Sequence, residues 1–322
     1  MERATLLESL KMNFRSLTLE QFAGEFITKA QAIEDFYKLS CGVKAGNTIS
    51  LLFNPHRLST DNEKDDLSVY ESLQDDNKLS GLARLYLYNL EHGCNNAFYS
   101  AIQRGYQNIQ YINEFPPYVA RTIYMTYGKE RVSDSRLKVL DPCAGWGGRM
   151  IGCASIPNTT YVACEPSTKT YEGLNKLGEW LKTLQPTFEF KVYHTPYEEW
   201  TDFDEKFDIA LTSPPYYNTE HYSDEPTNSL NKFNTYESWV EGFYSALIMN
   251  TAKRLKDDAV FILNVGDRKY TLSDDMFKIC ENNGLFCERI YDYLSGNGEG
   301  KEKFYCISNQ KCLSTDKEFS LF

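Results

Sequence analysis

The chain has 322 residues, of which 42% are hydrophobic and 14% aromatic, and its formal net charge at pH 7 is -11. This size allows one large or two moderate hydrophobic cores, and the acidic balance argues against the basic surface that tight duplex binders carry. No apolar run approaches the roughly 20 residues that span a bilayer, and the first residues lack a signal-peptide core. The nine cysteines show no C-x-x-C pairs or His/Cys ligand spacing, so we expect reduced thiols, no metal site and a cytoplasmic protein.

Residues 1–110 differ in character from the rest of the chain. Amphipathic helical patches run over 18–38 and 81–104, and Thr18 stands three residues before Gln21, the spacing of a helix capping box. No internal repeat or glycine-serine linker follows, so we expect a mostly helical domain that packs on the remainder. This part is nearly neutral, and six basic residues form either a local basic face or an ordinary solvated surface: Lys11, Arg15, Arg57, Arg84, Arg104 and Arg121.

Two motifs flank the first predicted strand, residues 138–140. Upstream lies Asn113-Glu114-Phe115-Pro116-Pro117-Tyr118-Val119-Ala120, whose prolines suit a helix start. Downstream lies Asp141-Pro142-Cys143-Ala144-Gly145-Trp146-Gly147-Gly148. Glycines let the backbone approach a ligand closely, but the spacing is not the dinucleotide fingerprint G-x-G-x-x-G. Because Asp141 would repel a pyrophosphate, the loop predicts a cationic or zwitterionic ligand.

Polar residues also end the next two predicted strands. Residues 161–164 lead into Glu165-Pro166, and a carboxylate at such a strand tip can hold a ribose diol. By itself this acid also suits a solvated loop. Residues 190–193 lead into His194-Thr195-Pro196, in which the histidine has a second interpretation as a half-buried strand residue.

The apolar run 207–212 leads into the tetrapeptide Ser213-Pro214-Pro215-Tyr216. The prolines lack backbone donors and fix φ, so they end a central strand and leave a rigid loop. The serine hydroxyl, the freed carbonyls and the tyrosine ring form a cradle suited to an exocyclic amino group on a flat heterocycle. The alternative is a strand-ending turn with a packed tyrosine. The following stretch, 217–225, is either a target-contacting loop or a surface loop whose tyrosines pack on the domain.

Strand and helix patterns alternate after residue 130, which predicts a mainly parallel sheet covered on both faces. Further strands are expected over 208–211 and 260–265, and helices over 171–184 and 236–255. The last two runs, 285–293 and 303–308, are expected to pair around the turn 295–300. In such a sheet, ligands lie at the carboxyl ends of the strands, where five of the polar residues fall: Asp141, Glu165, Thr195, Ser213 and Asn264.

The glycine loop, the strand-end acid and the tetrapeptide together resemble the class I S-adenosylmethionine-dependent methyltransferases, specifically the branch that methylates amino groups of bases in DNA. The motif order resembles the gamma arrangement of that branch. The resemblance implies a catalytic domain over 111–322 with a Rossmann-like, mainly parallel seven-stranded sheet and a carboxyl-terminal antiparallel hairpin. The mostly helical region 1–110 would then supply substrate recognition.

The cofactor implied by the resemblance is S-adenosylmethionine. In that family the glycine loop holds the methionine part, the next strand-end acid holds the ribose, and the end of the third strand flanks the adenine. The matching positions in this chain are Phe115, Pro117, Asp141, Pro142, Cys143, Ala144, Gly145, Gly147, Glu165, Pro166, Thr195, Pro196 and Ser213.

The resemblance also implies how a flipped target base would be held. The Ser213 side chain and the Pro214 carbonyl would accept hydrogen bonds from the amine, while Pro215 and Tyr216 complete the cradle and the tyrosine stacks on the base. Substrate contacts are implied for Tyr217, Asn218 and Tyr222.

A serine in the first position of the cradle resembles cytosine-N4 enzymes more than adenine-N6 enzymes. The implied partner is DNA in a bacterial or phage-infected cell, as in restriction-modification or phage DNA modification. The alternatives are methylation of RNA, a nucleotide or a protein, and a binding module without catalysis. The sequence does not indicate an oligomeric state.

Overall fold

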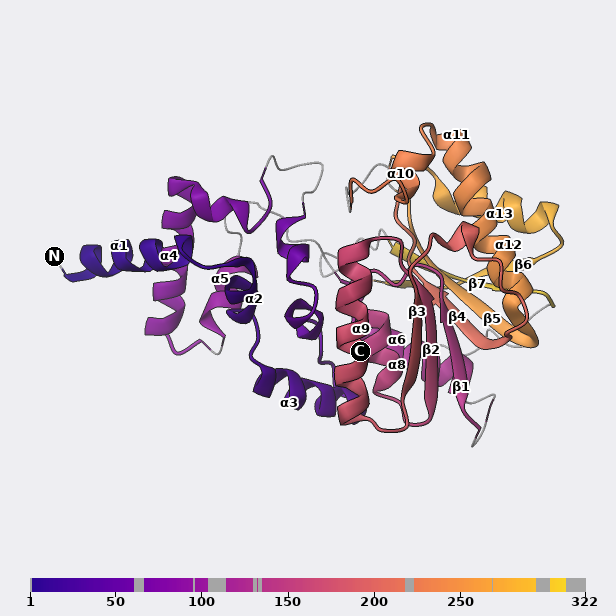
Figure 1. Ribbon diagram of the computed structural model, residues 1–322, viewed down its shortest axis with the longest axis horizontal. Coiled ribbons are helices and arrows are strands. Elements are labelled where there is room, and N and C mark those ends of the chain that lie inside the picture. Colours follow the sequence, from indigo (N-terminus) through magenta and orange to yellow (C-terminus); the bar gives the residue numbers. More distant parts are fainter. Residues whose placement is uncertain are drawn as a thin grey trace.

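A seven-stranded sheet forms the centre of the carboxyl-terminal part of this computed structural model (Figure 1). The structure describes residues 2–60, 67–94, 96–103, 114–129, 132, 135–217, 223–267, 269–293 and 302–310. The strand order is β3-β2-β1-β4-β5-β7-β6. The strands are β1 (Leu137–Asp141), β2 (Thr159–Cys164), β3 (Glu189–Tyr193), β4 (Phe207–Thr212), β5 (Leu255–Gly266), β6 (Phe286–Tyr293) and β7 (Glu302–Ser308).

The direction of the strands gives the fold class. Strands β1 to β5 pair in parallel, while β7 lies antiparallel between β5 and β6. This is the Rossmann-like fold of the class I methyltransferases, and the predicted fold class is confirmed. The predicted turn 295–300 of the last hairpin lies outside the described residues.

The strand order reverses between β1 and β4, which are neighbours in the sheet although β2 and β3 separate them in the chain. A crevice forms at the carboxyl ends of the strands at such a switch point, and ligands of open α/β sheets bind there. The glycine loop follows β1 and the Ser-Pro-Pro-Tyr tetrapeptide follows β4. The topology therefore places the two predicted motifs on the two sides of one crevice.

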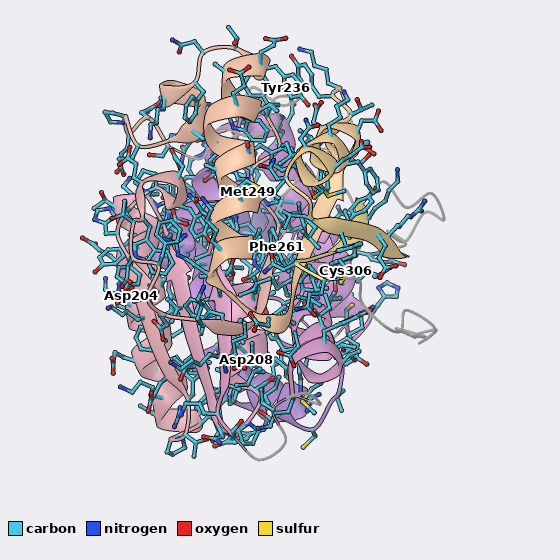
Figure 2. All side chains as sticks on the ribbon, turned by 90° about the vertical axis from the view of Figure 1, so that its right-hand side faces the viewer. Asp204, Asp208, Tyr236, Met249, Phe261 and Cys306 are labelled. Carbon is cyan, nitrogen blue, oxygen red and sulfur yellow. The ribbon has the colours of Figure 1, made fainter. Side chains whose placement is uncertain are left out.

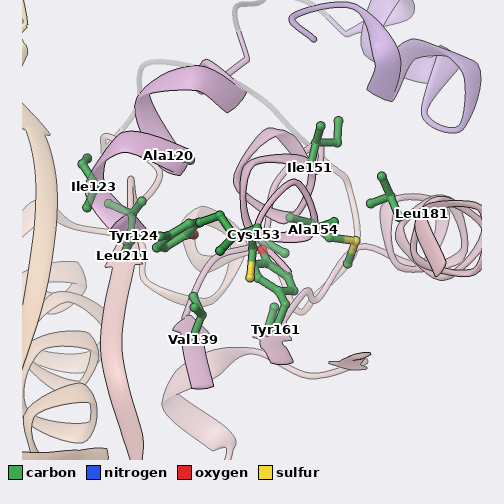
Figure 3. Close-up of a cluster of buried hydrophobic side chains, with 14 of the residues drawn as sticks. Ala120, Ile123, Tyr124, Val139, Ile151, Cys153, Ala154, Tyr161, Leu181 and Leu211 are labelled. Atoms are coloured by element: carbon green, nitrogen blue, oxygen red, sulfur yellow. The ribbon is translucent and has the colours of Figure 1, made fainter. Parts of the chain in front are cut away.

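Helices cover both faces of the sheet (Figure 1). One face carries α6 (Pro117–Ile123), the π-helix Tyr124–Lys129, α8 (Gly148–Ala154) and α9 (Thr168–Leu184). Figure 3 shows this core, in which Val139 and Tyr161 of the sheet lie below Ile151 of α8. The burial of β1, β2 and β4 on both faces explains why these strands are nearly all apolar in sequence.

The opposite face carries α12 (Ser245–Arg254) and α13 (Leu272–Asn282). Figure 2 shows α12, which bears Met249, lying over the strand that bears Phe261. The shorter elements of this part of the chain are the 3-10 turn Tyr197–Glu199, α10 (Ser229–Lys232), and α11 (Tyr236–Trp239) with the π-helix Val240–Tyr244, which run directly into α12. The helix predicted over 236–255 is therefore one continuous run with a π-helical middle section.

The amino-terminal region is helical, as predicted, and has its own core. Its elements are α1 (Glu2–Arg15), α2 (Leu19–Gly24), α3 (Lys29–Ser40), α4 (Asp76–Glu91) and α5 (Ala97–Gln103), with 3-10 turns Ile49–Leu52, Pro55–Ser59 and Glu71–Gln74. Phe22, Phe26 and Phe98 pack edge to face at centroid distances of 5.5 Å in each pair. The Thr18–Gln21 capping box is confirmed.

Each predicted amino-terminal helical patch is broken in the structure. A second capping box at Thr28 and Gln31 starts a new helix inside 18–38, and the turn after Glu91 divides 81–104. The predicted packing of this region on the sheet domain is confirmed, because Phe36 of α3 meets Trp180 of α9 at 6.4 Å between ring centroids.

Candidate active site

Asp141, at the end of β1, is the most completely bonded residue of the crevice. Its buried carboxylate accepts hydrogen bonds from Arg149 Nε (2.7 Å), Tyr161 Oη (2.6 Å) and Thr212 Oγ1 (2.9 Å). The Cys143 backbone N–H donates to Asp141 Oδ1 at 3.3 Å and to Thr212 Oγ1 at 3.2 Å. Thr212 immediately precedes the tetrapeptide, so one buried carboxylate joins the glycine loop to the cradle.

This bonding defines what Asp141 does in the protein itself. The Arg149 guanidinium lies within salt-bridge distance and balances the carboxylate charge, and both side chains are buried. An isolated buried carboxylate would be strongly unfavourable, so the pair stabilises the loop only as a unit. Asp141 shapes the glycine loop, and its direct contact with a ligand stays a prediction.

Backbone conformation and packing explain why glycine stands at positions 145 and 147 of the loop. Gly145 and Gly147 have φ of 56° and 102°, in the left-handed region that favours glycine. A Cβ on Gly147 would lie 2.5 Å from Leu177 of α9, whereas a Cβ on Gly145 would find its nearest neighbours at 3.9 Å. Gly147 is therefore favoured by its φ and by its close packing against Leu177, whereas Gly145 is favoured by its φ alone.

Glu165, at the end of β2, lies beside Gly145. Its carboxylate oxygens accept hydrogen bonds from the backbone N–H groups of Gly145 (3.2 Å) and Ser167 (2.9 Å). Burial raises the pKa of Glu165 to about 8, opposed by these two hydrogen bonds. The predicted ribose acid and the predicted glycine loop are thus in direct contact. The solvated-loop alternative for Glu165 is wrong, because the side chain is buried.

Other residues predicted at the cofactor loop also gather there. The Phe115 ring lies 5.2 Å from the Arg149 guanidinium carbon, and Pro117 begins α6, which packs on α8. The Ala144 N–H donates to Cys164 O at 3.0 Å, which ties the loop to β2. Burial raises the pKa of the Cys143 thiol well above its usual value, so this cysteine stays protonated and is no nucleophile.

The end of β3 lies next to the start of α9. His194 is exposed and stacks on Tyr171 at 4.6 Å between centroids, so its interpretation as a half-buried residue is wrong. Thr195 is half-buried, and its hydroxyl contacts Pro196 O at 3.3 Å. These positions border the crevice on the β2 side, where the resemblance places the adenine.

The segment 223–228 returns from the cradle to this same border. Glu225 accepts hydrogen bonds from Thr168 N (3.0 Å) and Thr168 Oγ1 (2.9 Å), at the first turn of α9. Thr227 Oγ1 donates to Pro166 O at 3.3 Å. A carboxylate at a helix N-terminus satisfies free backbone donors and interacts well with the helix dipole.

In the cradle, three polar side chains converge. Tyr216 Oη lies 3.4 Å from Ser213 Oγ and 3.5 Å from Asn264 Oδ1, both near the outer limit of a hydrogen bond. Asn264 is buried in β5 and donates to Lys303 O. The sequence places Asn264 at a strand end but assigns it no role; its position on the strand next to β4 is the signal that could have done so.

Tyr217 is packed rather than extended. Its ring lies 5.5 Å from Tyr236, 5.8 Å from Trp239 and 5.4 Å from Tyr270, and its hydroxyl contacts Asn234 O at 3.4 Å. Tyr217 therefore packs on the domain, which is the alternative to its predicted contact with the substrate. The other two predicted substrate contacts, Asn218 and Tyr222, lie outside the described residues.

Metal-binding clusters and membrane-spanning helices are both absent from the part of the chain that the structure describes. Among those residues, no group of three or more His, Cys, Asp or Glu side chains is arranged to hold a metal ion. Over the same residues, no helix is long and apolar enough to cross a membrane.

No family model matches the chain, and no curated protein matches it significantly. Solved structures do match. A TehB-like SAM-dependent methyltransferase from Corynebacterium glutamicum has 12% identity and a TM-score of 0.38, covering 71% of this chain and 99% of its own. Magnesium protoporphyrin IX methyltransferase from Synechocystis, solved with bound SAM, has 13% identity and a TM-score of 0.40, covering 60% and 79%.

An rRNA methylase from Streptococcus thermophilus has 10% identity and a TM-score of 0.40, covering 61% of this chain and 98% of its own. Similarity at this level does not bear on the substrate of this protein. Its fold class follows from the strand order and strand directions described above.

Proposed function

We propose that this protein binds S-adenosylmethionine and transfers its methyl group to the exocyclic amino group of a base in DNA, with cytosine N4 slightly favoured over adenine N6. The observation that carries the proposal is the hydrogen bond between Thr212 and Asp141. Through it, the loop suited to the methyl donor and the loop suited to the amine share one rigid support at the switch point of the sheet.

The residues present fit the cofactor. Gly145 is half-buried and has no side chain to keep a ligand from its backbone, and Glu165 lies directly beside it. A carboxylate accepts hydrogen bonds at several lone-pair positions, so Glu165 retains acceptor capacity for the two ribose hydroxyls beyond its two backbone bonds. Thr195 and Pro196 would flank the adenine, and Phe115 would lie at the amino-acid end. When bound, the cofactor supplies an electrophilic methyl group on its sulfonium.

The cradle residues position the amine. Ser213 Oγ and the Pro214 carbonyl would accept hydrogen bonds from the amino group, which draws its lone pair out of conjugation with the ring. With the cofactor bound, the amine nitrogen held by these two acceptors would take the methyl group from the sulfonium and lose one proton to solvent. The 3.4 Å contact between Ser213 and Tyr216 is long, so an entering amine displaces it at little cost. Holding both reactants in line supplies most of the rate.

The choice of DNA rests on the resemblance of the tetrapeptide. The amino-terminal basic residues do not add to it: Lys11 and Arg15 pair with Glu8 and Asp76, and Arg57 is buried. The local basic face considered from the sequence stays a prediction, for which Arg84 is an exposed candidate. Arg104, also considered for it, lies outside the described residues.

The test is to incubate the protein with labelled S-adenosylmethionine and, separately, with DNA, RNA, nucleotides and protein. We expect label in DNA. Label in RNA, nucleotide or protein but not in DNA would overturn the substrate while leaving the chemistry intact. Failure to bind the cofactor would overturn the enzyme assignment and leave the non-catalytic binding module.

A further inference from the structure

Part of the amino-terminal region lies directly on the cofactor loop. Residues 49–59, here called the docking segment, bury Leu51 and Leu58 in the helical core and meet α9 at Thr170 and Gly173. Asn54 Nδ2 donates a 3.0 Å hydrogen bond to Trp146 O, between the two left-handed glycines of the loop. The His56 ring meets the Trp146 ring edge-on at 5.3 Å, and His56 Nε2 shares a 3.0 Å hydrogen bond with Thr170 Oγ1 of α9.

Two glycines of the sheet domain lie where a neighbouring segment approaches closely: Gly173 under the docking segment and Gly148 under Glu114. A Cβ on Gly173 of α9 would lie 1.9 Å from Asn54 Oδ1 and 2.6 Å from Phe53 O. A Cβ on Gly148 would lie 2.8 Å from Glu114 Cγ. All three distances are shorter than a Cβ tolerates, so each glycine is favoured by the close approach of the neighbouring chain.

Glu114 connects the docking segment to the far side of the loop. Its carboxylate accepts hydrogen bonds from Ser50 Oγ at 2.6 Å and from Arg57 Nη1 at 2.7 Å. Ser50, Asn54 and Arg57 are all at most 1% exposed. The docking segment therefore reaches the loop at Trp146 by a buried hydrogen bond and is joined by buried polar contacts to Glu114, which packs closely on Gly148.

These contacts matter because the other hydrogen bonds of the loop hold residues 143–145, before Trp146. Gly145 and Gly147 lack side chains, and ordering a glycine backbone costs more conformational entropy than ordering any other residue. Trp146, between them, is held at its carbonyl by Asn54 and at its ring by His56. The hydrogen bond to its carbonyl fixes the peptide plane between Trp146 and Gly147, and the Gly145 N–H two peptides earlier in the loop meets Glu165.

We propose that the docking segment is a structural part of the cofactor site, in which Asn54 and His56 are positioning residues that hold Trp146 and so keep the glycine loop around it in its cofactor-receiving conformation. The proposal rests on the proposed function for the identity of the cofactor. It gives the amino-terminal region a task beyond the substrate recognition expected from the sequence.

The first experiment compares Asn54→Ala with Asn89→Ala. Asn89 is an equally buried asparagine that donates a 3.0 Å hydrogen bond to Ala97 O inside the helical core, far in sequence from the loop. Hydrogen exchange of the ligand-free protein is followed over residues 141–154. We expect exchange in this peptide to rise about fivefold in Asn54→Ala, as for one lost hydrogen bond, and to stay unchanged in Asn89→Ala.

The second readout is binding of S-adenosylmethionine by calorimetry. Asn54→Ala should weaken it about five- to tenfold and raise the KM for the cofactor with kcat nearly unchanged at saturation. If wild-type protein binds no cofactor, the proposed function fails while the exchange result still judges the docking contact. Equal exchange over 141–154 in Asn54→Ala and Asn89→Ala would overturn the inference, whatever the binding result.

A second variant reaches the same contact from the other side. Gly173→Ala leaves Asn54 intact but pushes the docking segment off α9, so it should raise exchange over 141–154 as Asn54→Ala does. Gly24→Ala is the matched control, because a Cβ there meets nothing within 4 Å. If Gly173→Ala folds and exchanges over 141–154 as Gly24→Ala does, the inference is overturned.

Discussion

Thr212 Oγ1 donates a 2.9 Å hydrogen bond to Asp141 Oδ1, although 71 residues separate the two in the chain. The same hydroxyl oxygen accepts the Cys143 N–H at 3.2 Å. The glycine loop and the Ser-Pro-Pro-Tyr loop therefore share one buried hydrogen-bond network, and a substitution at Thr212 should affect both loops.

Thr212→Val keeps the shape of the side chain but removes the hydroxyl. We expect a loss of about 1–3 kcal/mol in the free energy of unfolding, because the Cys143 N–H and one Asp141 oxygen each lose a buried partner. Cofactor affinity should fall on the order of tenfold. Thr212→Ser is the control and should retain both quantities. Urea unfolding and calorimetry measure them, and equal behaviour of the two variants would contradict the shared support.

Asp141→Asn breaks the buried pair with Arg149. Removing one partner of a buried ion pair leaves the other charge uncompensated, and we expect a loss of about 3–5 kcal/mol in the free energy of unfolding. Urea denaturation followed by circular dichroism measures it. A variant that is as stable as wild type but does not bind cofactor would instead make Asp141 a pure ligand contact.

Glu165 predicts a pH dependence of cofactor binding. Burial raises the pKa of Glu165 to about 8, with Asp141 and Arg149 as its charged neighbours. Only the carboxylate can accept from both ribose hydroxyls, so affinity for S-adenosylmethionine should rise from pH 7 to pH 9 with a midpoint of about 8. Calorimetry across this range tests it, with Glu165→Gln as the variant that should show no such rise.

The same shift has the opposite sign for folding. The folded protein holds the Glu165 proton more tightly than the unfolded chain, whose ordinary carboxyl pKa is 4.5. This stabilisation is complete below pH 4.5 and is lost as the pH rises through about 8. Relative to Glu165→Gln, ligand-free wild type should therefore lose stability between pH 5 and pH 9; a difference that grows in the other direction would contradict the shift.

Glu225→Gln tests the contact between segment 223–228 and α9. The variant keeps the shape but loses the charge that caps Thr168, so we expect the free energy of unfolding to fall by about 0.5–2 kcal/mol. Glu172→Gln, an exposed acid on the same helix, is the matched control. A loss of the same size in both variants would make the effect one of net charge alone.

The strands that carry the site could be predicted from the sequence. Their burial on both faces leaves continuous apolar runs, which end at Asp141, Glu165 and Ser213. The sequence was also sufficient for the Thr18 cap, which depends on residues three apart. The same local evidence could not show that Arg149 neutralises Asp141, since that pair depends on how the loop folds back.

Contacts across long separations were missed for the same reason. Asn54 and Trp146 are 92 residues apart, and nothing in the spacing of either residue indicates the other. Gly173 has no motif around it, yet its lack of a Cβ is explained at once by the docking segment that covers it. Such residues become visible only when the two parts of the chain are packed together.

The central claim is amino methylation in the cradle, and mass analysis of nucleosides from DNA incubated with the protein and labelled S-adenosylmethionine tests it most directly. Wild type should produce N4-methylcytosine, whereas Ser213→Ala and Tyr216→Ala should lose transfer and still bind cofactor by calorimetry. DNA nucleosides without label, in a reaction where RNA or protein becomes labelled, would contradict the claim, as would full activity in both variants.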